Sequence, residues 1–496
     1  MAENKKQEPP PQREPTITHH TLQVGTAHIA YDAHAHWMPM RDENEKVIAE
    51  MFHVAYLQQE APTGSRPLTF VFNGGPGAAS AYLHVGALGP RRIDFPDDGS
   101  LPASPIRMID NDTSWLAFTD LVFIDPIGTG FSRTMPPKEG ADGKPDPKAE
   151  EKKKAFWNVE KDLQALCDFI RGFLTQHKRW GSPVFIAGES YGGFRVARLM
   201  QRLQQEGGVG LSGAILISPA LEFSALMGSD YDVLPWLDHL PTMAAAGYTH
   251  GRAKPAADTI EGHMAEAERF GREELLIALA SGDAMPAAQR TAIFQKMADL
   301  TGLDPRLVAR CGGRISIRRF CRELLSDQGL VVGLYDASVT ATDPYPDREN
   351  FEGPDPTLAG LDRLFTAGIY MQLREQLNVE EAIRDYQLLS YDVFLSWRYD
   401  SDGQQNQGTV SATDQFRYGI ALNDHTEILI SHGTFDLVTP YFTSNRLTDL
   451  MRLTPAQRKR MTLQHFRGGH MFYTHKQSRD AFFETAHQFY GRALAR

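Results

Sequence analysis

A serine between two glycines is the first feature of this chain that points to covalent chemistry. Ser190 lies in the segment Gly188-Glu189-Ser190-Tyr191-Gly192, which follows the apolar run 184–186 and precedes a helix-like stretch. A Gly-x-Ser-x-Gly pattern between a strand and a helix is typical of a nucleophilic serine held on a tight turn. The pattern alone is weak, because glycine and serine are common residues. Its context therefore has to decide whether Ser190 is a nucleophile.

A serine nucleophile needs a base that takes its proton, and the base needs a carboxylate that orients it. Asp436 follows the apolar run 428–430, and His470 follows two glycines after the strand-like segment 462–466. A lone aspartate or histidine in such a place is more often a turn residue or a solvated side chain. The order Ser190, Asp436, His470 is a known order of a catalytic triad. Because each residue comes directly after a predicted strand, we expect all three at one edge of a sheet.

A second glycine-rich segment could stabilise the negative charge that forms when a serine attacks a carbonyl. The segment Asn73-Gly74-Gly75-Pro76-Gly77 follows an apolar run that ends at Phe72. We predict that the N–H groups of Gly75 and Tyr191 form an oxyanion hole. A phosphate-binding loop is the alternative, but the Gly-Lys-Ser/Thr ending of such loops is missing here.

No cofactor or metal is expected, because a triad supplies its own base. His34 and His36 lie one residue apart, a spacing that could bind a metal from a strand. No third or fourth ligand can be identified from the sequence, so solvated or packed histidines are the favoured interpretation.

The elements that would position these residues alternate between strands and helices. Short runs that are apolar on both faces indicate a parallel sheet buried between helices, and they lie at 68–72, 121–124, 184–187, 214–217 and 428–430. Between them, the apolar residues from Phe156 to Phe173 recur at helical spacing. Upstream, the segments 20–31 and 47–57 predict two strands joined by a loop. The fold class is therefore α/β, with a mostly parallel sheet flanked by helices.

Two regions interrupt this alternation. Residues 136–154 are rich in Pro, Gly, Asp and Lys, which predicts a mobile loop. Residues 221–415 carry helical patterns, such as 265–279 and 361–383, without strand-like runs between them. We expect a disordered tail at 1–18 and a catalytic domain formed by 19–220 and 416–496. Between these two segments we expect an inserted, largely helical cap at 221–415.

The bulk composition limits the kind of protein and its partners. The chain has 496 residues, of which 42% are hydrophobic and 23% charged, as in a globular protein with a large core. A formal charge of −11 without a basic stripe argues against nucleic acid as a partner. Apolar stretches stay shorter than the ~18 residues that span a bilayer, so no membrane association is expected.

The expected location is cytoplasmic. Residues 1–18 are charged and rich in proline, and they contain no apolar core of a signal peptide. Cys167, Cys311 and Cys321 are an odd and sparse set, which favours free thiols in a reducing compartment. Cys311 and Cys321 are close enough in sequence to pair if the compartment were oxidising.

As a set, these motifs resemble the serine carboxypeptidase family. The resemblance rests on the segments 73–77, 188–192 and 468–471 and on the Asp436 loop that ends at Pro440. It implies an α/β-hydrolase fold and the removal of residues from the free C-terminus of a peptide through an acyl-enzyme. It further implies that Asn73, Gly74 and Glu189 bind the terminal carboxylate of the substrate. Two carboxyl groups in contact must share a proton, so such a site works best in mild acid.

The chain departs from the family pattern at several positions. Ala87 stands where the family commonly has a second glutamate, Ala78 where it has a cysteine, and Tyr473 where it usually has a proline. The disulfides of the family cannot all form in this chain, which has only three cysteines. These departures keep two alternatives open: an esterase, amidase or acyltransferase that uses the same triad, and a binding protein with an inactive site. The expected partner is a peptide or a small acyl substrate.

Overall fold

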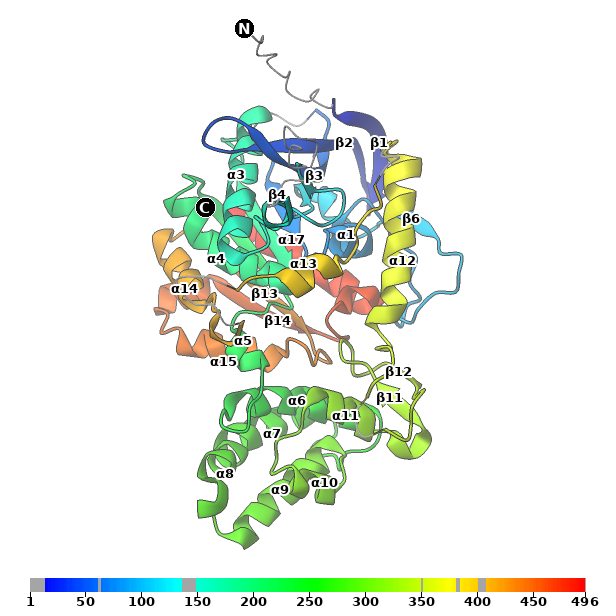
Figure 1. Ribbon diagram of the computed structural model, residues 1–496, viewed down its shortest axis with the longest axis vertical. Helices are drawn as coiled ribbons and strands as arrows, with labels where there is room; N and C mark the ends of the chain where they lie inside the picture. Colours follow the sequence, from blue (N-terminus) through cyan, green and yellow to red (C-terminus); the bar gives the residue numbers. More distant parts are fainter. Residues whose placement is uncertain are drawn as a thin grey trace.

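One ten-stranded sheet runs through the main body of the protein (Figure 1). The computed structural model describes residues 14–60, 64–135, 149–348, 351–380, 384–399 and 407–495. The strands follow one another across the sheet in the order β1 (Thr16–Val24), β2 (Ala27–Arg41), β3 (Val47–Gln58), β7 (Asp120–Ile124), β4 (Leu68–Phe72), β9 (Val184–Glu189), β10 (Leu211–Ile217), β13 (Glu427–Gly433) and β14 (Met461–Phe466), and the short strand β8 (Arg133–Thr134) pairs with β3.

The six strands from β7 to β14 are parallel to their neighbours, as the short apolar runs predict. Strands β4, β7 and β9 are buried along their whole length. Successive side chains of a strand point to opposite faces, so an apolar residue at every position requires cover on both faces. The α/β fold class and the mostly parallel sheet flanked by helices are thereby confirmed.

Helices cover both faces of this sheet. Helices α3 (Val159–Gln176) and α4 (Tyr191–Gln205) pack with Phe70 and Ile186, which point to one face. Helix α17 (Lys476–Leu494) packs with Val71 and Ala187, which point to the other. Asn158 caps the start of α3 by accepting the backbone N–H of Lys161, which satisfies an end group that the helix leaves open. Helix α3 thus begins at Val159, after the first residue of its predicted apolar stripe.

The N-terminal strands differ from their prediction. The segment 20–31 is not one strand, because the chain turns at Gly25, whose φ of 56° suits glycine, and β1 and β2 form a hairpin. The apolar positions shift by one residue across this turn, from Leu22 and Val24 to Ile29 and Tyr31, so the segment does not alternate as one strand would. Strand β1 begins at Thr16, inside the segment predicted as a disordered tail. Residues 1–13 of that tail lie outside the described residues.

The chain between β10 and β13 forms a separate helical lobe and then returns to the sheet (Figure 1). The lobe has its own apolar core, and its helices are α6 (Leu234–Thr249), α7 (Ile260–Phe270), α8 (Leu276–Ser281), α9 (Ala287–Thr301), α10 (Pro305–Arg310) and α11 (Ile317–Glu323). The same region also contains a short strand pair that no strand-like run marked in the sequence: β11 (Leu330–Val332) pairs with β12 (Thr340–Thr342).

The rest of this region packs on the sheet domain. Helix α12 (Leu358–Tyr370) places Leu364 and Phe365 in the same core as the sheet residue Val71. It continues as a π-helical turn that ends at Gln376, so the predicted helix 361–383 is too long at its C-terminal end. Residues 381–383 lie outside the described residues. Helix α13 (Tyr391–Ser396) follows and also lies on the main body (Figure 1).

Three further predictions from the sequence concern a loop, the cysteines and membrane-spanning helices. In the predicted mobile loop 136–154, residues 136–148 lie outside the described residues, and α2 (Ala149–Lys153) is helical. Cys167, Cys311 and Cys321 are free thiols. In the described part of the chain, no helix combines the length and the apolar character needed to cross a membrane.

A buried histidine predicts how stability depends on pH. The ring of His53 packs against Phe169 at 4.9 Å between ring centroids, and burial lowers the pKa of His53 to about 3. The unfolded chain binds a proton at this side chain below about pH 6.5, so its contribution to stability is lost as the pH falls from 6.5 toward 3. We expect the free energy of unfolding to fall between pH 7 and pH 4.5, and to fall by roughly 2 kcal/mol less in His53→Phe. Urea unfolding at both pH values measures this difference, and equal losses in the two proteins would contradict it.

Candidate active site

Ser190 lies on a sharp turn between β9 and α4. Its backbone has φ 62° and ψ −123°, a conformation that costs a residue other than glycine about 1–3 kcal/mol. The turn is held by the neighbouring strand end: the Ser190 N–H donates to the carbonyl of Ile217 at 2.9 Å, and the Ser190 carbonyl accepts from Ala220 at 3.2 Å. Strain of this kind, fixed by the surrounding backbone, is typical of a functional residue.

The glycines of the two motifs allow two backbone segments to touch. A Cβ atom on Gly192 would lie 2.7 Å from the carbonyl oxygen of Phe72, and one on Gly74 would overlap the backbone nitrogen of Tyr191. The glycine loop therefore lies directly against the turn that carries Ser190. Neither the Gly75 nor the Tyr191 N–H donates a hydrogen bond to another described residue. The two predicted oxyanion donors thus lie in segments that touch, and no other described residue accepts a hydrogen bond from either N–H group.

Asp436 and His470 form a buried hydrogen-bonded pair. Oδ2 of Asp436 lies 2.7 Å from Nδ1 of His470, and the two residues are 0% and 5% exposed. The other oxygen of Asp436 accepts the backbone N–H groups of Val438 at 2.9 Å and Thr439 at 3.0 Å, and the Thr439 hydroxyl donates to Oδ2 at 2.6 Å. These donors stabilise the ionised carboxylate and fix its orientation.

The electrostatic environment favours a proton on His470. Burial acts to lower the pKa of His470, but the hydrogen bond and charge of Asp436, together with the charge of Glu189, outweigh it and raise the pKa above 6.5. Because Nδ1 faces Asp436, Nε2 is the nitrogen left to take a proton from a nucleophile. This arrangement suits a general base whose protonated form is stabilised.

The end of β10 joins the serine turn to the histidine loop. The Ser190 N–H bonds Ile217, and the hydroxyl of the next residue, Ser218, donates to the carbonyl of His470 at 2.9 Å. The carbonyl of Ser218 accepts from the Thr439 hydroxyl at 3.0 Å. The three loops predicted to carry a triad therefore meet at one edge of the sheet. In the described residues, no hydrogen bond joins the Ser190 hydroxyl to His470.

The inserted region holds the aspartate and histidine loops in place. The carbonyl of Tyr335 accepts the His470 N–H at 2.6 Å, and the Leu334 carbonyl accepts the Leu437 N–H at 3.1 Å. The Tyr335 ring also stands edge-on to the imidazole, with 5.4 Å between centroids. Sequence reasoning missed Tyr335, because no motif marks the segment that carries it.

Glu189, the residue before the serine, is buried in a polar network. It is 3% exposed and accepts a hydrogen bond from the side-chain amide of Asn73. Burial, the largest cause, raises its pKa to about 7, although His470, Tyr473 and Asn73 favour the ionised form. Glu189 thus changes its charge near neutral pH. The predicted pair of Asn73 and Glu189 is in direct contact.

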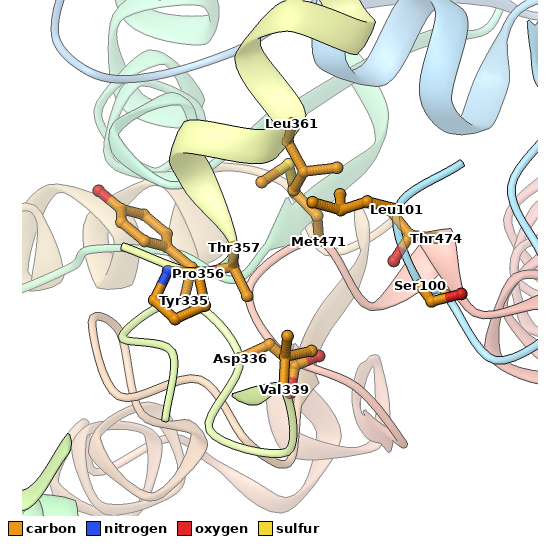
Figure 2. A pocket seen from close by; sticks show the side chains of 11 residues that line it. Ser100, Leu101, Tyr335, Asp336, Val339, Pro356, Thr357, Leu361, Met471 and Thr474 are labelled. Carbon is orange, nitrogen blue, oxygen red and sulfur yellow. The ribbon is translucent and has the colours of Figure 1, made fainter. Parts of the chain in front are cut away.

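A cavity of about 40 Å³ lies beside the histidine loop (Figure 2). Its wall includes Tyr335, which contacts His470, and Met471, the residue that follows it. Leu101 from the sheet domain and Leu361 from α12 contribute apolar surface. A cavity that meets the candidate site at Tyr335 and Met471 has room for a small group of a bound ligand.

Comparison with known proteins shows a similarity to serine carboxypeptidases. Residues 30–223 match the family model described as serine carboxypeptidase. This matched segment is similar to serine carboxypeptidases and makes up less than half of the chain. Serine carboxypeptidase-like 36 of Arabidopsis thaliana is 28% identical over 180 residues, which cover 36% of this chain and 33% of that protein. Serine carboxypeptidase ctsa-3.2 of Caenorhabditis elegans is 28% identical over 152 residues, 30% of this chain and 25% of that protein.

A solved structure supports the fold over the whole length. The crystal structure of the prohormone-processing carboxypeptidase Kex1 of Saccharomyces cerevisiae superposes with a TM-score of 0.55 and 15% identity, and covers 92% of each chain. The chain matches about a third or less of the length of the two curated serine carboxypeptidases above. The matched segment 30–223 contains Asn73, Glu189 and Ser190, whereas the assignment of Asp436 and His470 rests on their geometry.

The pair geometry predicts the titration of His470. In Asp436→Asn the hydrogen-bonded negative charge is gone while burial remains, so the pKa of His470 should fall. NMR titration of the His470 ring in both proteins measures the shift. A pKa that stays the same or rises in Asp436→Asn would contradict the assigned pairing, and an unchanged titration of exposed His425 in both proteins controls for a general change.

Proposed function

We propose that this protein is a serine carboxypeptidase that removes the C-terminal residue of a peptide through an acyl-enzyme on Ser190. The observation that carries the proposal is the buried hydrogen bond of 2.7 Å between Asp436 and His470, at the sheet edge where Ser190 sits on its strained turn. The match of residues 30–223 to the serine carboxypeptidase family model supports the reaction class. No cofactor enters the reaction, because the base and the nucleophile are side chains of this chain.

In the proposed mechanism, His470 takes the proton of Ser190 as the hydroxyl oxygen attacks the scissile carbonyl. Asp436 holds the tautomer of His470 and stabilises the imidazolium. The N–H groups of Gly75 and Tyr191 bind the oxyanion. His470 then gives its proton to the leaving amine, and a water molecule, activated by His470, hydrolyses the ester. The hydrogen bond between the Ser190 hydroxyl and His470 would form in the substrate complex, since catalytic hydrogen bonds often tighten only there.

Glu189 and Asn73 are the proposed binding site for the free carboxylate of the substrate. A carboxylate can approach Glu189 only when this side chain is protonated, because two buried anions in contact repel each other. Because its pKa is raised to about 7, Glu189 is protonated in mild acid and partly protonated at neutral pH. This supports a peptidase that favours free-acid over amide substrates.

The first test removes the nucleophile. Ser190→Ala should lower kcat for release of a C-terminal residue by about three orders of magnitude or more, as for other serine triads. Labelling by a fluorophosphonate probe should be lost in parallel. Ser218→Ala is the matched control, because Ser218 lies at the same sheet edge but bonds the His470 carbonyl; it should keep the label. A Ser190→Ala protein that keeps full peptidase activity would refute the proposal.

The second test uses pH. The KM for a free-acid peptide should rise as the pH increases above about 7, since Glu189 then carries a charge. Glu189→Gln cannot ionise, so its KM should stay flat between pH 6 and pH 8.5. Steady-state kinetics with a peptide and its C-terminal amide check both statements. A KM that changes with pH in the same way for the amide would rule out Glu189 as the carboxylate-binding group.

A further inference from the structure

Two polar atoms next to the proposed triad are buried without a hydrogen bond. They are Oε1 of Glu189 and the hydroxyl oxygen of Tyr473. A buried polar atom without a partner costs about 1–3 kcal/mol, and most such atoms in proteins are paired. Glu189 immediately precedes Ser190 and Tyr473 closely follows His470 in the chain. Both groups are therefore candidates for hydrogen bonds to a ligand.

Small residues on the facing helical turn make room for Tyr473. Its ring is fully buried in the turn η8 (Phe472–Thr474), and a Cβ atom on Gly86 would lie 3.1 Å from that ring. Ala87, the next residue, stands where the family commonly has a second acidic side chain. The phenol of Tyr473 lies near enough to Glu189 to favour the ionised carboxylate and so to lower its pKa. Tyr473 thus lies near Glu189, the residue that the family's second glutamate would accompany.

The neighbours of Glu189 leave mostly neutral donors for a ligand. The side-chain oxygen of Asn73 accepts the Leu83 N–H at 3.1 Å, which turns its amide nitrogen toward Glu189. The titratable groups that face Glu189 are Asp436, Tyr82, Tyr473 and His470. Of these, only His470 can become cationic. An anionic end of a ligand would therefore be held by hydrogen bonds rather than by a lysine or arginine.

The cavity reaches the turn η8 that carries Tyr473. Met471 and Thr474, which stand directly before and after the residues Phe472 and Tyr473, both line its wall (Figure 2).

We propose that Tyr473 is a specificity-determining residue, whose hydroxyl acts with the Glu189 carboxyl and Asn73 to bind the free carboxylate of the residue that leaves. This inference rests on the proposed function for the identity of the ligand. Tyr473 then supplies the hydrogen bond that Ala87 cannot, so the chain keeps a carboxylate site with one acidic group instead of two.

Binding to inactive protein tests this proposal directly. We would compare Ser190→Ala with Ser190→Ala/Tyr473→Phe by calorimetry, using N-acetyl-phenylalanyl-leucine and its C-terminal amide. Tyr473→Phe should weaken binding of the free acid about tenfold or more, the effect of one hydrogen bond to a charged group, and change the amide less than twofold. The pH at which free-acid binding weakens should also rise, since the phenol no longer favours ionised Glu189.

The control is Tyr490→Phe on the same background. Tyr490 is also buried, and its hydroxyl bonds Thr69 at 2.5 Å in the sheet core; its loss should leave the acid-to-amide ratio unchanged. Equal weakening of both ligands by Tyr473→Phe, or no weakening of either, would overturn the inference. If the unmodified protein cleaves neither peptide but the free acid alone loses affinity in Tyr473→Phe, the proposed peptidase function fails and the inference stands.

Discussion

The buried hydrogen bond between Asp436 and His470 is the interaction on which the site depends. A charged carboxylate with no exposed surface is tolerated only when its oxygens are paired. The loop 436–439 meets this need with two backbone N–H groups and the Thr439 hydroxyl. Because those donors have to be in place, the loop after β13 has one conformation, and the imidazole follows it. The backbone of Tyr335 then fixes the histidine loop from the inserted region.

The serine side of the site depends on backbone contact rather than on charge. Ser190 keeps a strained conformation because Ile217 at the end of β10 and Ala220 just beyond it bond its backbone. Glycines also let the glycine loop lie against this turn. The same contact brings the Asn73 side chain to Glu189. Nucleophile, oxyanion donors and the polar network around Glu189 are therefore one packed unit. The cost of the strain is met by the surrounding fold, as at many functional sites.

Much of this could be predicted from the sequence, for identifiable physical reasons. Strands buried on both faces leave continuous apolar runs, so β4, β7, β9, β10 and β13 could be predicted, and Asn73, Ser190 and Asp436 follow three of them closely. The hairpin turn at Gly25 was missed, although the apolar positions change phase there, from Leu22 and Val24 to Ile29 and Tyr31. Tyr335 could not be predicted, because its contact with His470 depends on the path of about two hundred inserted residues that carry no motif. The proximity of Tyr473 to Glu189 likewise could not be predicted, because it depends on the packing of the Tyr473 ring against Gly86 in the folded protein.

The central claim is that the loops of Ser190, Asp436 and His470 form one reactive centre. A crystal structure of the protein after reaction with a fluorophosphonate tests it most directly. We predict phosphorus bonded to the Ser190 hydroxyl oxygen, a phosphoryl oxygen within hydrogen-bond distance of the Gly75 and Tyr191 N–H groups, and Nε2 of His470 close to the serine oxygen. Phosphorus on another side chain, or an imidazole turned away from the adduct with its Asp436 bond broken, would contradict the account.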